Sequence, residues 1–151
     1  PIDVIGMGAS AHLPTFVEDH ITRHDVEAFR QAYEMAGIQG SDLDCLSVHD
    51  AFTCNTYMTA ELGGYFAAGE GIKATLEGRT RADGDRPLTV SGGRSGFGHS
   101  WTATGGSEVY EAVKQMRGAA ANPLSHRPEL YGVHSLGSGE LSSVMVLRAR
   151  G

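Results

Sequence analysis

Residues 43–50, LDCLSVHD, form a short apolar run that ends in two polar side chains. An apolar run of this length predicts a buried strand. A helical pattern follows it at 51–67, and an earlier one at 24–37 ends on Gly37, a residue that commonly closes a helix. The stretch is therefore predicted to be a strand between two helices. The apolar residues at helical spacing in the earlier helix are Val26, Phe29, Ala32, Tyr33 and Ala36.

The same alternation of strands and helices continues in both directions from this stretch. Segments that alternate in this way predict an α/β fold, in which helices pack on a mainly parallel sheet. We expect a mixed, mainly parallel five-stranded sheet with helices packed on it, whose last strand can be antiparallel. The remaining expected elements are strands at 3–9, 87–93, 132–139 and 142–150, a helix at 104–117, and a helical turn at 72–77 within a loop over 68–86.

Composition indicates one soluble globular domain over residues 1–151. The chain has 40% hydrophobic and 20% charged residues, a net charge of -6 and scattered arginines, which excludes the clustered cations of a nucleic-acid-binding protein. No apolar run approaches the roughly 20 residues of a membrane span, so we expect a cytoplasmic or organellar-matrix protein. Cys45 and Cys54 lack the spacing of a disulfide framework or a zinc site. Because the chain begins at Pro1, we expect it to be one portion of a longer polypeptide.

Two short motifs resemble ligand sites but favour ordinary structure. GMGASA at 6–11 fits a dinucleotide-binding fingerprint, yet Pro14 and the weak pattern after it argue against the helix that this fingerprint needs. His20 and His24 have the spacing of two metal ligands on a helix, but a third ligand is not near them in the sequence. We therefore expect two solvated histidines rather than a metal site.

His49 and Asp50 follow the predicted strand directly. Side chains at the carboxyl ends of strands in α/β folds point into the ligand crevice, so His49 is a candidate functional residue. The alternatives are that Asp50 caps the next helix and that His49 is a satisfied residue at the rim of the sheet.

His99 lies in a glycine-rich turn between the predicted strand at 87–93 and the helix at 104–117. Glycines let a backbone approach a ligand closely, and the start of the helix offers N–H donors to a developing oxyanion. A histidine at this place can act as a general base or as a neutral donor. Because His49 and His99 are expected to follow neighbouring strands at one sheet edge, a functional role is favoured over a turn-capping one.

Three motifs together resemble the C-terminal half of the thiolase superfamily. They are HDAF at 49–52, GFGHSWTATGG at 96–106 and VHSLGSGELSSVMVL at 133–147, which occur in the family's order and spacing. The sequence is most similar to the sterol-carrier-protein-type thiolases, also described as lipid-transfer proteins. The resemblance covers nearly the whole chain, and it implies a thiolase-like C-terminal domain.

The resemblance implies roles for four residues. His99 matches the histidine that activates the nucleophilic cysteine and helps to form an oxyanion hole for the thioester carbonyl. His49 stands where thiolases have an asparagine that holds a water in that hole, and its N–H could donate directly. Gly137 matches a glycine whose backbone amide contributes to a second oxyanion hole. Ser135 aligns with the acid/base cysteine of the family, and its hydroxyl is too weak an acid to replace a thiol.

The family's nucleophilic cysteine lies in an N-terminal half that this chain lacks. The resemblance therefore implies a partner, either a preceding domain or a separate subunit, in a homo- or hetero-oligomer that dimerises through the missing half. It also implies a coenzyme A thioester as the substrate, with no tightly bound cofactor. The cysteine that the sterol-carrier-type thiolases carry in their His-Asp-Cys-Phe motif is replaced by Ala51, and we expect Cys54, one turn beyond, to be buried.

Three functions fit these residues. The first is carbon–carbon bond formation or cleavage on an acyl-CoA in lipid or sterol side-chain metabolism, for which this chain supplies one half of the site. The second is a retro-aldolase that acts on a hydroxyacyl-CoA in complex with an OB-fold, zinc-binding partner, and the missing thiols favour it over ordinary thiolysis. The third is a non-catalytic binding subunit with a thiolase fold.

Overall fold

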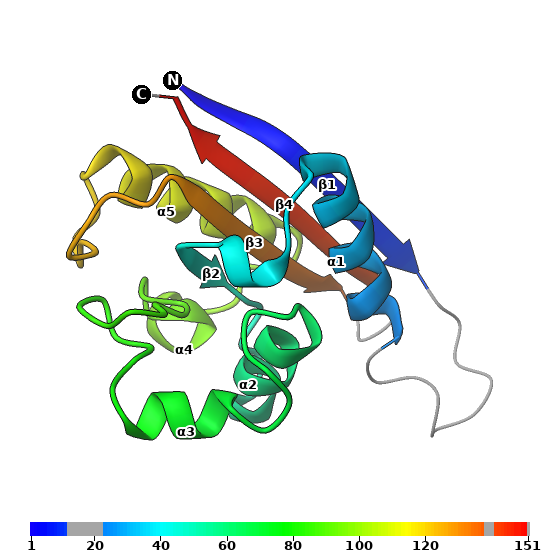
Figure 1. The fold of residues 1–151 in the computed structure, drawn as a ribbon, viewed down its shortest axis with the longest axis horizontal. Coiled ribbons are helices and arrows are strands. Elements are labelled where there is room, and N and C mark those ends of the chain that lie inside the picture. The colour runs from blue at the N-terminus through cyan, green and yellow to red at the C-terminus, as the bar shows by residue number, and fades with distance from the viewer. Residues whose placement is uncertain (12–22, 138–140, 151) are drawn as a thin grey trace.

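The fold is built on a four-stranded mixed sheet (Figure 1). The computed structural model describes residues 1–11, 23–137 and 141–150. The strands lie in the order β1-β4-β3-β2; β4 pairs antiparallel with both β1 and β3, and β2 pairs parallel with β3. The sheet is therefore mainly antiparallel. The strands are β1 (Ile2–Ala11), β2 (Cys45–Ser47), β3 (Leu130–Gly137) and β4 (Leu141–Ala149).

The expectation of a mainly parallel five-stranded sheet is wrong in two respects. Strands β1 and β3 both pair antiparallel with β4, and the segment at 87–93 does not form a fifth strand. It makes one isolated parallel bridge, between Leu46 of β2 and Leu88. Pro87 accepts a hydrogen bond from Leu46 but has no N–H to donate, and Thr89 has a φ of 49°. A positive φ turns the backbone away from an extended path, so pairing with β2 ends there.

All of the expected helices form, although the one expected at 51–67 covers only Thr53–Leu62, and a further short helix, α4, forms inside the glycine-rich turn. The expected helix at 104–117 has the bounds of α5, and the expected turn at 72–77 lies within one residue of α3. Gly37 follows the first helix with a φ of 67°, as its closing role requires. The helices are α1 (Arg23–Ala36), α2 (Thr53–Leu62), α3 (Gly71–Leu76), α4 (Gly93–Phe97) and α5 (Thr104–Arg117), with two 3-10 turns at Gly40–Asp42 and Trp101–Ala103.

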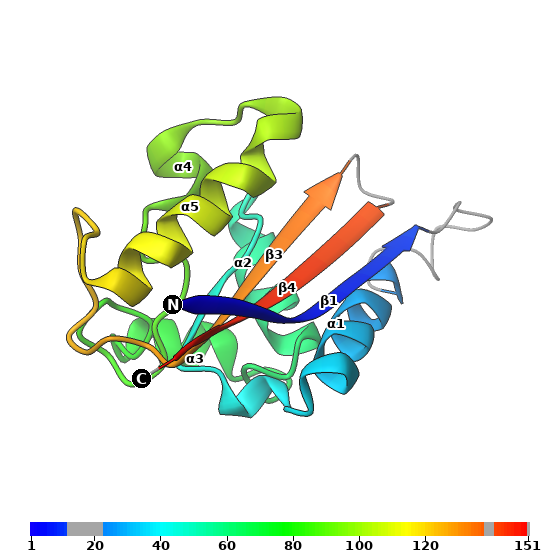
Figure 2. The same ribbon diagram turned by 90° about the horizontal axis from the view of Figure 1, so that it is seen from above.

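Helices α1 and α5 cover opposite faces of the sheet (Figure 2). The core on the α1 side contains Phe29 and Ala32, which are buried as expected, whereas Val26 is 45% exposed and does not belong to it. The core on the α5 side contains Ala112 and Met116 together with residues of β3 and β4. The sheet is thus sandwiched between two layers of helix, and α5 leads away from the turn that contains the candidate histidine.

The GMGASA stretch lies inside β1 and allows α1 to approach that strand closely. A Cβ atom on Gly6 would lie 2.2 Å from the carbonyl oxygen of Ala32, and one on Gly8 would lie 2.0 Å from that of Ala28. Because β1 continues to Ala11, these glycines do not form the strand-to-helix turn of a dinucleotide site. Both positions are glycine because the backbone of α1 leaves no room for a side chain.

We expect Gly8→Ala to lower the free energy of unfolding by about 3 kcal/mol, because overpacking against a helix backbone forces the two elements apart. Gly106→Ala is the matched control, since a Cβ at that helical position has no neighbour within 4 Å. Urea unfolding of both variants checks this prediction. Equal stability of the two variants would contradict the close contact between β1 and α1.

Candidate functional site

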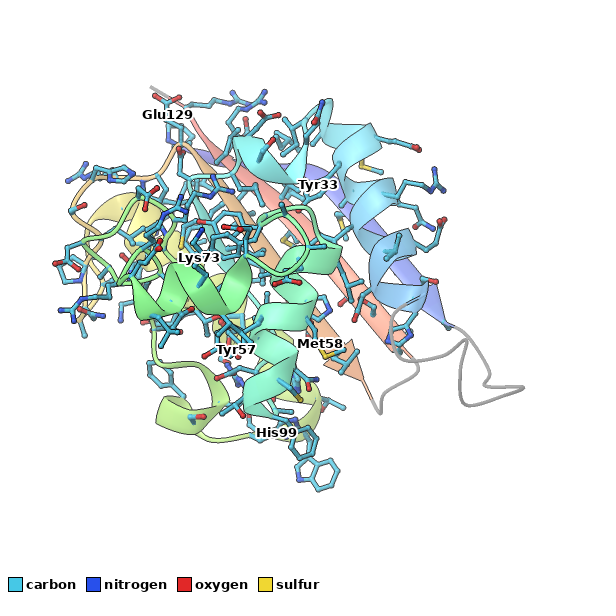
Figure 3. All side chains as sticks on the ribbon, turned by 60° about the horizontal axis from the view of Figure 1, so that its bottom comes forward. Tyr33, Tyr57, Met58, Lys73, His99 and Glu129 are labelled. Carbon is cyan, nitrogen blue, oxygen red and sulfur yellow. The ribbon has the colours of Figure 1, made fainter. Side chains whose placement is uncertain are left out.

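His49 and His99 lie against each other. Their ring centroids are 5.2 Å apart and the ring planes are inclined by 85°, which is an edge-to-face arrangement. His49 comes two residues after the end of β2, and His99 lies in the loop between α4 and α5. Figure 3 shows His99 at the periphery of the molecule, on the side where α2 and α4 lie. Two residues fifty positions apart therefore form one pair of imidazoles.

His49 is buried and electrically neutral at physiological pH. Its side chain is 4% exposed, and its Nδ1 has no hydrogen-bond partner among the described residues. Burial lowers the pKa of His49 to about 4, and charges on His99, His134 and Arg94 act in the same direction, against the opposing effect of Asp50. A neutral imidazole has one N–H donor and one acceptor nitrogen. His49 is thus suited to donate a hydrogen bond without carrying charge.

The low pKa of His49 predicts an acid-sensitive fold. In the unfolded chain a histidine takes up a proton near pH 6.5. The contribution of neutral His49 to the free energy of unfolding is therefore fully present above that pH and decreases as the pH falls towards 4. The shift corresponds to a loss of about 3 kcal/mol over this window. We expect His49→Asn to flatten this part of the pH dependence, measured by urea unfolding at several pH values. If the free energy of unfolding of His49→Asn fell with decreasing pH as steeply as that of wild type, other groups would cause the loss of stability.

His134 accepts a hydrogen bond from the backbone of His49, and it was not among the site residues predicted from the sequence. It is fully buried in β3, and its Nδ1 accepts the backbone N–H of His49 at 3.3 Å. Its Nε2 lies 2.9 Å from Asp25 Oδ1 and 3.1 Å from Ser142 Oγ. Burial raises the pKa of Asp25, but its hydrogen bonds with His134 and Ser142 and the nearby histidine charges outweigh burial and lower it. The signal for this network was an ionisable residue inside a strand that is otherwise uncharged.

His99 is exposed and is oriented by the backbone that follows it. Its Nδ1 accepts the N–H of Trp101 at 3.2 Å, and Trp101 adopts a φ of 53°. A bulky residue with positive φ is a strained arrangement that is found mainly at functional sites. Because Nδ1 is occupied as an acceptor, the neutral ring carries its proton on Nε2. The free edge of His99 therefore presents an N–H donor.

Asp50 caps a helix other than the one that follows it. Its Oδ1 accepts the N–H of Arg94 at 2.6 Å, at the start of α4. The residue before α2 is Phe52, which makes no capping bond through its side chain. The alternative in which Asp50 caps the helix that follows it is therefore wrong, although Asp50 does cap α4. Cys54, in the first turn of α2, is exposed, so the expectation that it is buried is also wrong.

Ser135 and Gly137 lie near the end of β3. A Cβ atom on Gly105 would lie 3.1 Å from Ser135 Oγ, so Ser135 faces the first turn of α5. Successive side chains of a strand point to opposite faces, which places Ser135 on the other side of the sheet from His134. Gly137 is the last residue of β3 and pairs with Leu141 of β4. The described contacts join His49 to His99 and to His134, and Ser135 to α5.

His24, which was expected to be solvated together with His20, differs from that expectation. His24 is 2% exposed in α1, and its Nε2 lies 3.8 Å from Asp25 Oδ1, so it is not solvated. His20 falls outside the described residues. Within residues 1–11, 23–137 and 141–150, no three His, Cys, Asp or Glu side chains are grouped as metal ligands.

Among the described helices, none has the length and apolar character needed to cross a membrane.

Part of the sheet face on the α5 side is uncovered. Helix α5 lies over β3, whereas Met7 of β1 is 53% exposed. An open groove of about 490 Å³ runs along this face, and it is lined by Met7, Val109, Val133, Ser135 and Met145 among others. An open groove with apolar lining residues is a place where another part of a protein can pack.

Comparison with known proteins places the chain in one family. Residues 9–149 match the family described as "Thiolase C-terminal domain-like". The chain is 40% identical over 119 residues to an acetyl-CoA acetyltransferase of Methanothermobacter thermautotrophicus, which aligns 78% of this chain with 31% of that protein. It is 32% identical over 113 residues to sterol carrier protein 2 of Bos taurus, aligning 75% with 21%. It is also 32% identical over 125 residues to the benzoylsuccinyl-CoA thiolase subunit BbsB of Thauera aromatica, aligning 79% with 32%.

A solved structure shares the fold. It is named "Ltp2-ChsH2(DUF35) aldolase", and it superposes with a TM-score of 0.83 at 22% identity, covering 99% of this chain and 40% of that one. The chain thus spans a fifth to a third of the length of the three relatives named above.

Proposed function

This chain belongs to the family of thiolase C-terminal domains, and from that membership we propose that it forms the C-terminal half of an active site that makes or breaks carbon–carbon bonds in acyl-CoA substrates. The observation that carries the proposal is the edge-to-face contact of His49 and His99, at 5.2 Å between ring centroids. The four site residues are His99, His49, Gly137 and Ser135. The substrate class is a coenzyme A thioester, and we propose no tightly bound cofactor.

The two imidazoles are proposed to stabilise negative charge on the thioester carbonyl oxygen. His99 presents Nε2–H because its Nδ1 accepts the Trp101 N–H, and His49 stays neutral because burial lowers its pKa to about 4. Donors that are fixed before the reaction stabilise an oxyanion without reorganising. An imidazolium at His99 would turn Nδ1 into a donor facing the Trp101 N–H, which favours the neutral donor role over that of a general base.

The backbone N–H of Gly137 is proposed to serve a second oxyanion hole. This role rests on the match to the family's glycine and on the place of Gly137 at the end of β3. The nucleophilic cysteine belongs to an N-terminal half, on a preceding domain or a partner subunit. The uncovered apolar groove beside α5 supports such a partner, because exposed apolar surface is stabilised when another surface covers it. Dimerisation through that half and a cytoplasmic location stay predictions.

A second candidate function is aldol cleavage of a hydroxyacyl-CoA, with the same two donors stabilising the enolate. The observation that favours it is the chemistry of the residues at the site, since Ser135 and Ala51 stand at the positions where thiolases carry an acid/base thiol. A serine hydroxyl does not shuttle protons near neutral pH as a thiol does. We propose that this reaction would use an OB-fold, zinc-binding partner.

The Ser135→Cys variant distinguishes the two reactions. If the enzyme is a thiolase, a thiol at this position should raise the rate of CoA-dependent cleavage of acetoacetyl-CoA by at least about 100-fold, the usual effect of a positioned acid/base group. Ser143→Cys is the matched control, because Ser143 also lines the groove but lies on β4. An unchanged rate in Ser135→Cys would favour aldol cleavage.

Identifying the partner tests the proposed function as a whole. Native mass spectrometry of the protein from its own source, with peptide mapping, shows what accompanies this chain. We expect a thiolase-like half with an accessible cysteine. A small zinc-containing OB-fold protein would support aldol cleavage instead, and the isolated chain would leave a non-catalytic binding subunit.

A further inference from the structure

Arg94 is a buried charge at the junction of α4, α5 and the strand end that bears His49. The residue is 8% exposed, and its guanidinium pairs with Glu108 of α5, which is 1% exposed. Burial raises the pKa of Glu108, and the Arg94 charge opposes that rise. Removing two charges from water costs about as much as their attraction returns, so a buried pair contributes little net stability. The pair is therefore better explained by the groups that Arg94 connects than by its own contribution to stability.

The backbone of Arg94 connects α4 to the His49 position. Its N–H donates to Asp50 Oδ1 at 2.6 Å, and Asp50 directly follows His49. The contact is close, because a Cβ atom on Gly93 would lie 2.1 Å from Asp50 Oδ2. The start of α4 is therefore fixed against the residue beside the first imidazole.

The side chain of Arg94 connects α4 to the His99 position. Its guanidinium donates to the carbonyl oxygen of Gly98 at 3.3 Å, and Gly98 directly precedes His99. The same guanidinium donates to Ser107 Oγ at 3.3 Å, and Ser107 in turn donates to the Thr104 carbonyl at 2.7 Å. One side chain thus joins the residue before the second imidazole to the first turn of α5.

We propose that Arg94, oriented by Glu108, is a positioning residue that sets the separation of His49 and His99. The inference rests on the proposed function of these two histidines. His99 is exposed, so packing alone does not fix its place, and the bond to Gly98 supplies a constraint from the protein interior. Arginine suits the task because its planar donors reach Glu108, Ser107 and Gly98 together, which a lysine does not.

The test compares Arg94→Met with the double variant Arg94→Met/Glu108→Leu in the assembled protein. Arg94→Met leaves the carboxylate of Glu108 unpaired, so both thermal stability and kcat fall. The double variant removes both charges of the buried pair and regains most of the thermal stability, because the only charge contact that stays lost is that of Arg94 Nε with Asp50 Oδ1, at 4.0 Å. It still lacks the donor to Gly98. We expect its kcat on acetoacetyl-CoA to stay about 100-fold below wild type, the usual cost of misplacing a reacting group, with little change in KM. Arg79→Met, which removes an exposed pair with Asp85, is the control and should change neither quantity.

A measurement without substrate accompanies the kinetics. Amide hydrogen exchange at residues 98–101 should be at least tenfold faster in the double variant and unchanged in the control. A double variant that regains wild-type kcat and exchange together with its stability would overturn the inference. His99→Ala is measured in parallel: if it abolishes turnover while the double variant is fully active, the inference alone fails, and if it keeps full activity, the proposed function fails with it.

Discussion

Replacing His99 with alanine is expected to lower kcat/KM of the assembled protein for acyl-CoA turnover by about 10³-fold, a typical effect of removing an oxyanion donor. The Nε2–H of His99 is fixed by the Trp101 N–H bound at Nδ1, so alanine removes an oriented donor rather than a mobile one. The exposed ring contributes little to the core, and the thermal stability of the variant should change by less than about 1 kcal/mol. Initial rates with acetoacetyl-CoA and CoA check the prediction.

The control for His99→Ala is His126→Ala, which removes another exposed histidine from the loop before β3. We expect His126→Ala to keep wild-type kcat and KM. If His99→Ala also kept full activity with acetoacetyl-CoA and CoA, thiolysis through this donor would not stand. The same result with a hydroxyacyl-CoA would exclude aldol cleavage through it.

The second large effect is expected at His49. His49→Phe fills a similar volume but removes the N–H, and we expect kcat to fall by about 10² to 10³-fold with KM little changed, because the lost bond forms mainly in the transition state. His49→Asn keeps a side-chain N–H donor and should recover part of the rate. The comparison of these two variants separates hydrogen bonding from packing.

The pH dependence of activity checks the same assignment at His49. With a pKa of about 4, this histidine stays neutral from pH 6 to 8, so its titration should not appear in the rate profile over that range. Equal loss of activity in His49→Phe and His49→Asn would indicate a packing role and contradict the donor role.

The sequence predicted those parts of the fold that depend on local pattern. The patterns at 24–37 and 104–117 matched α1 and α5, because each helix packs apolar residues at helical spacing, such as Phe29 and Ala32 or Ala112 and Met116, against the sheet. The contact of His49 and His99 was expected because both were predicted to follow neighbouring strands at one sheet edge. The two rings do lie together, although the segment at 87–93 makes only one bridge with β2 and His99 follows α4 instead of a strand. The family resemblance was carried by the same short stretches.

The features that the sequence did not predict depend on contacts between distant segments. The strand expected at 87–93 does not form, because Pro87 has no N–H to donate and Thr89 has a positive φ. An apolar pattern in the sequence does not predict this geometry. Positions 6 and 8 are glycine because the backbone of α1 approaches β1 closely there. The sequence alone does not show where α1 packs. Arg94 was not among the residues predicted for the site, and its partner Glu108 is fourteen positions away on another helix.

The most direct test of the account is a structure of the assembled protein with a bound acyl-CoA analogue in which a CH₂ group replaces the thioester sulfur. The account predicts that the analogue's carbonyl oxygen lies within about 3.2 Å of a ring nitrogen of both His49 and His99. A carbonyl oxygen bound out of hydrogen-bonding reach of both imidazoles would contradict it.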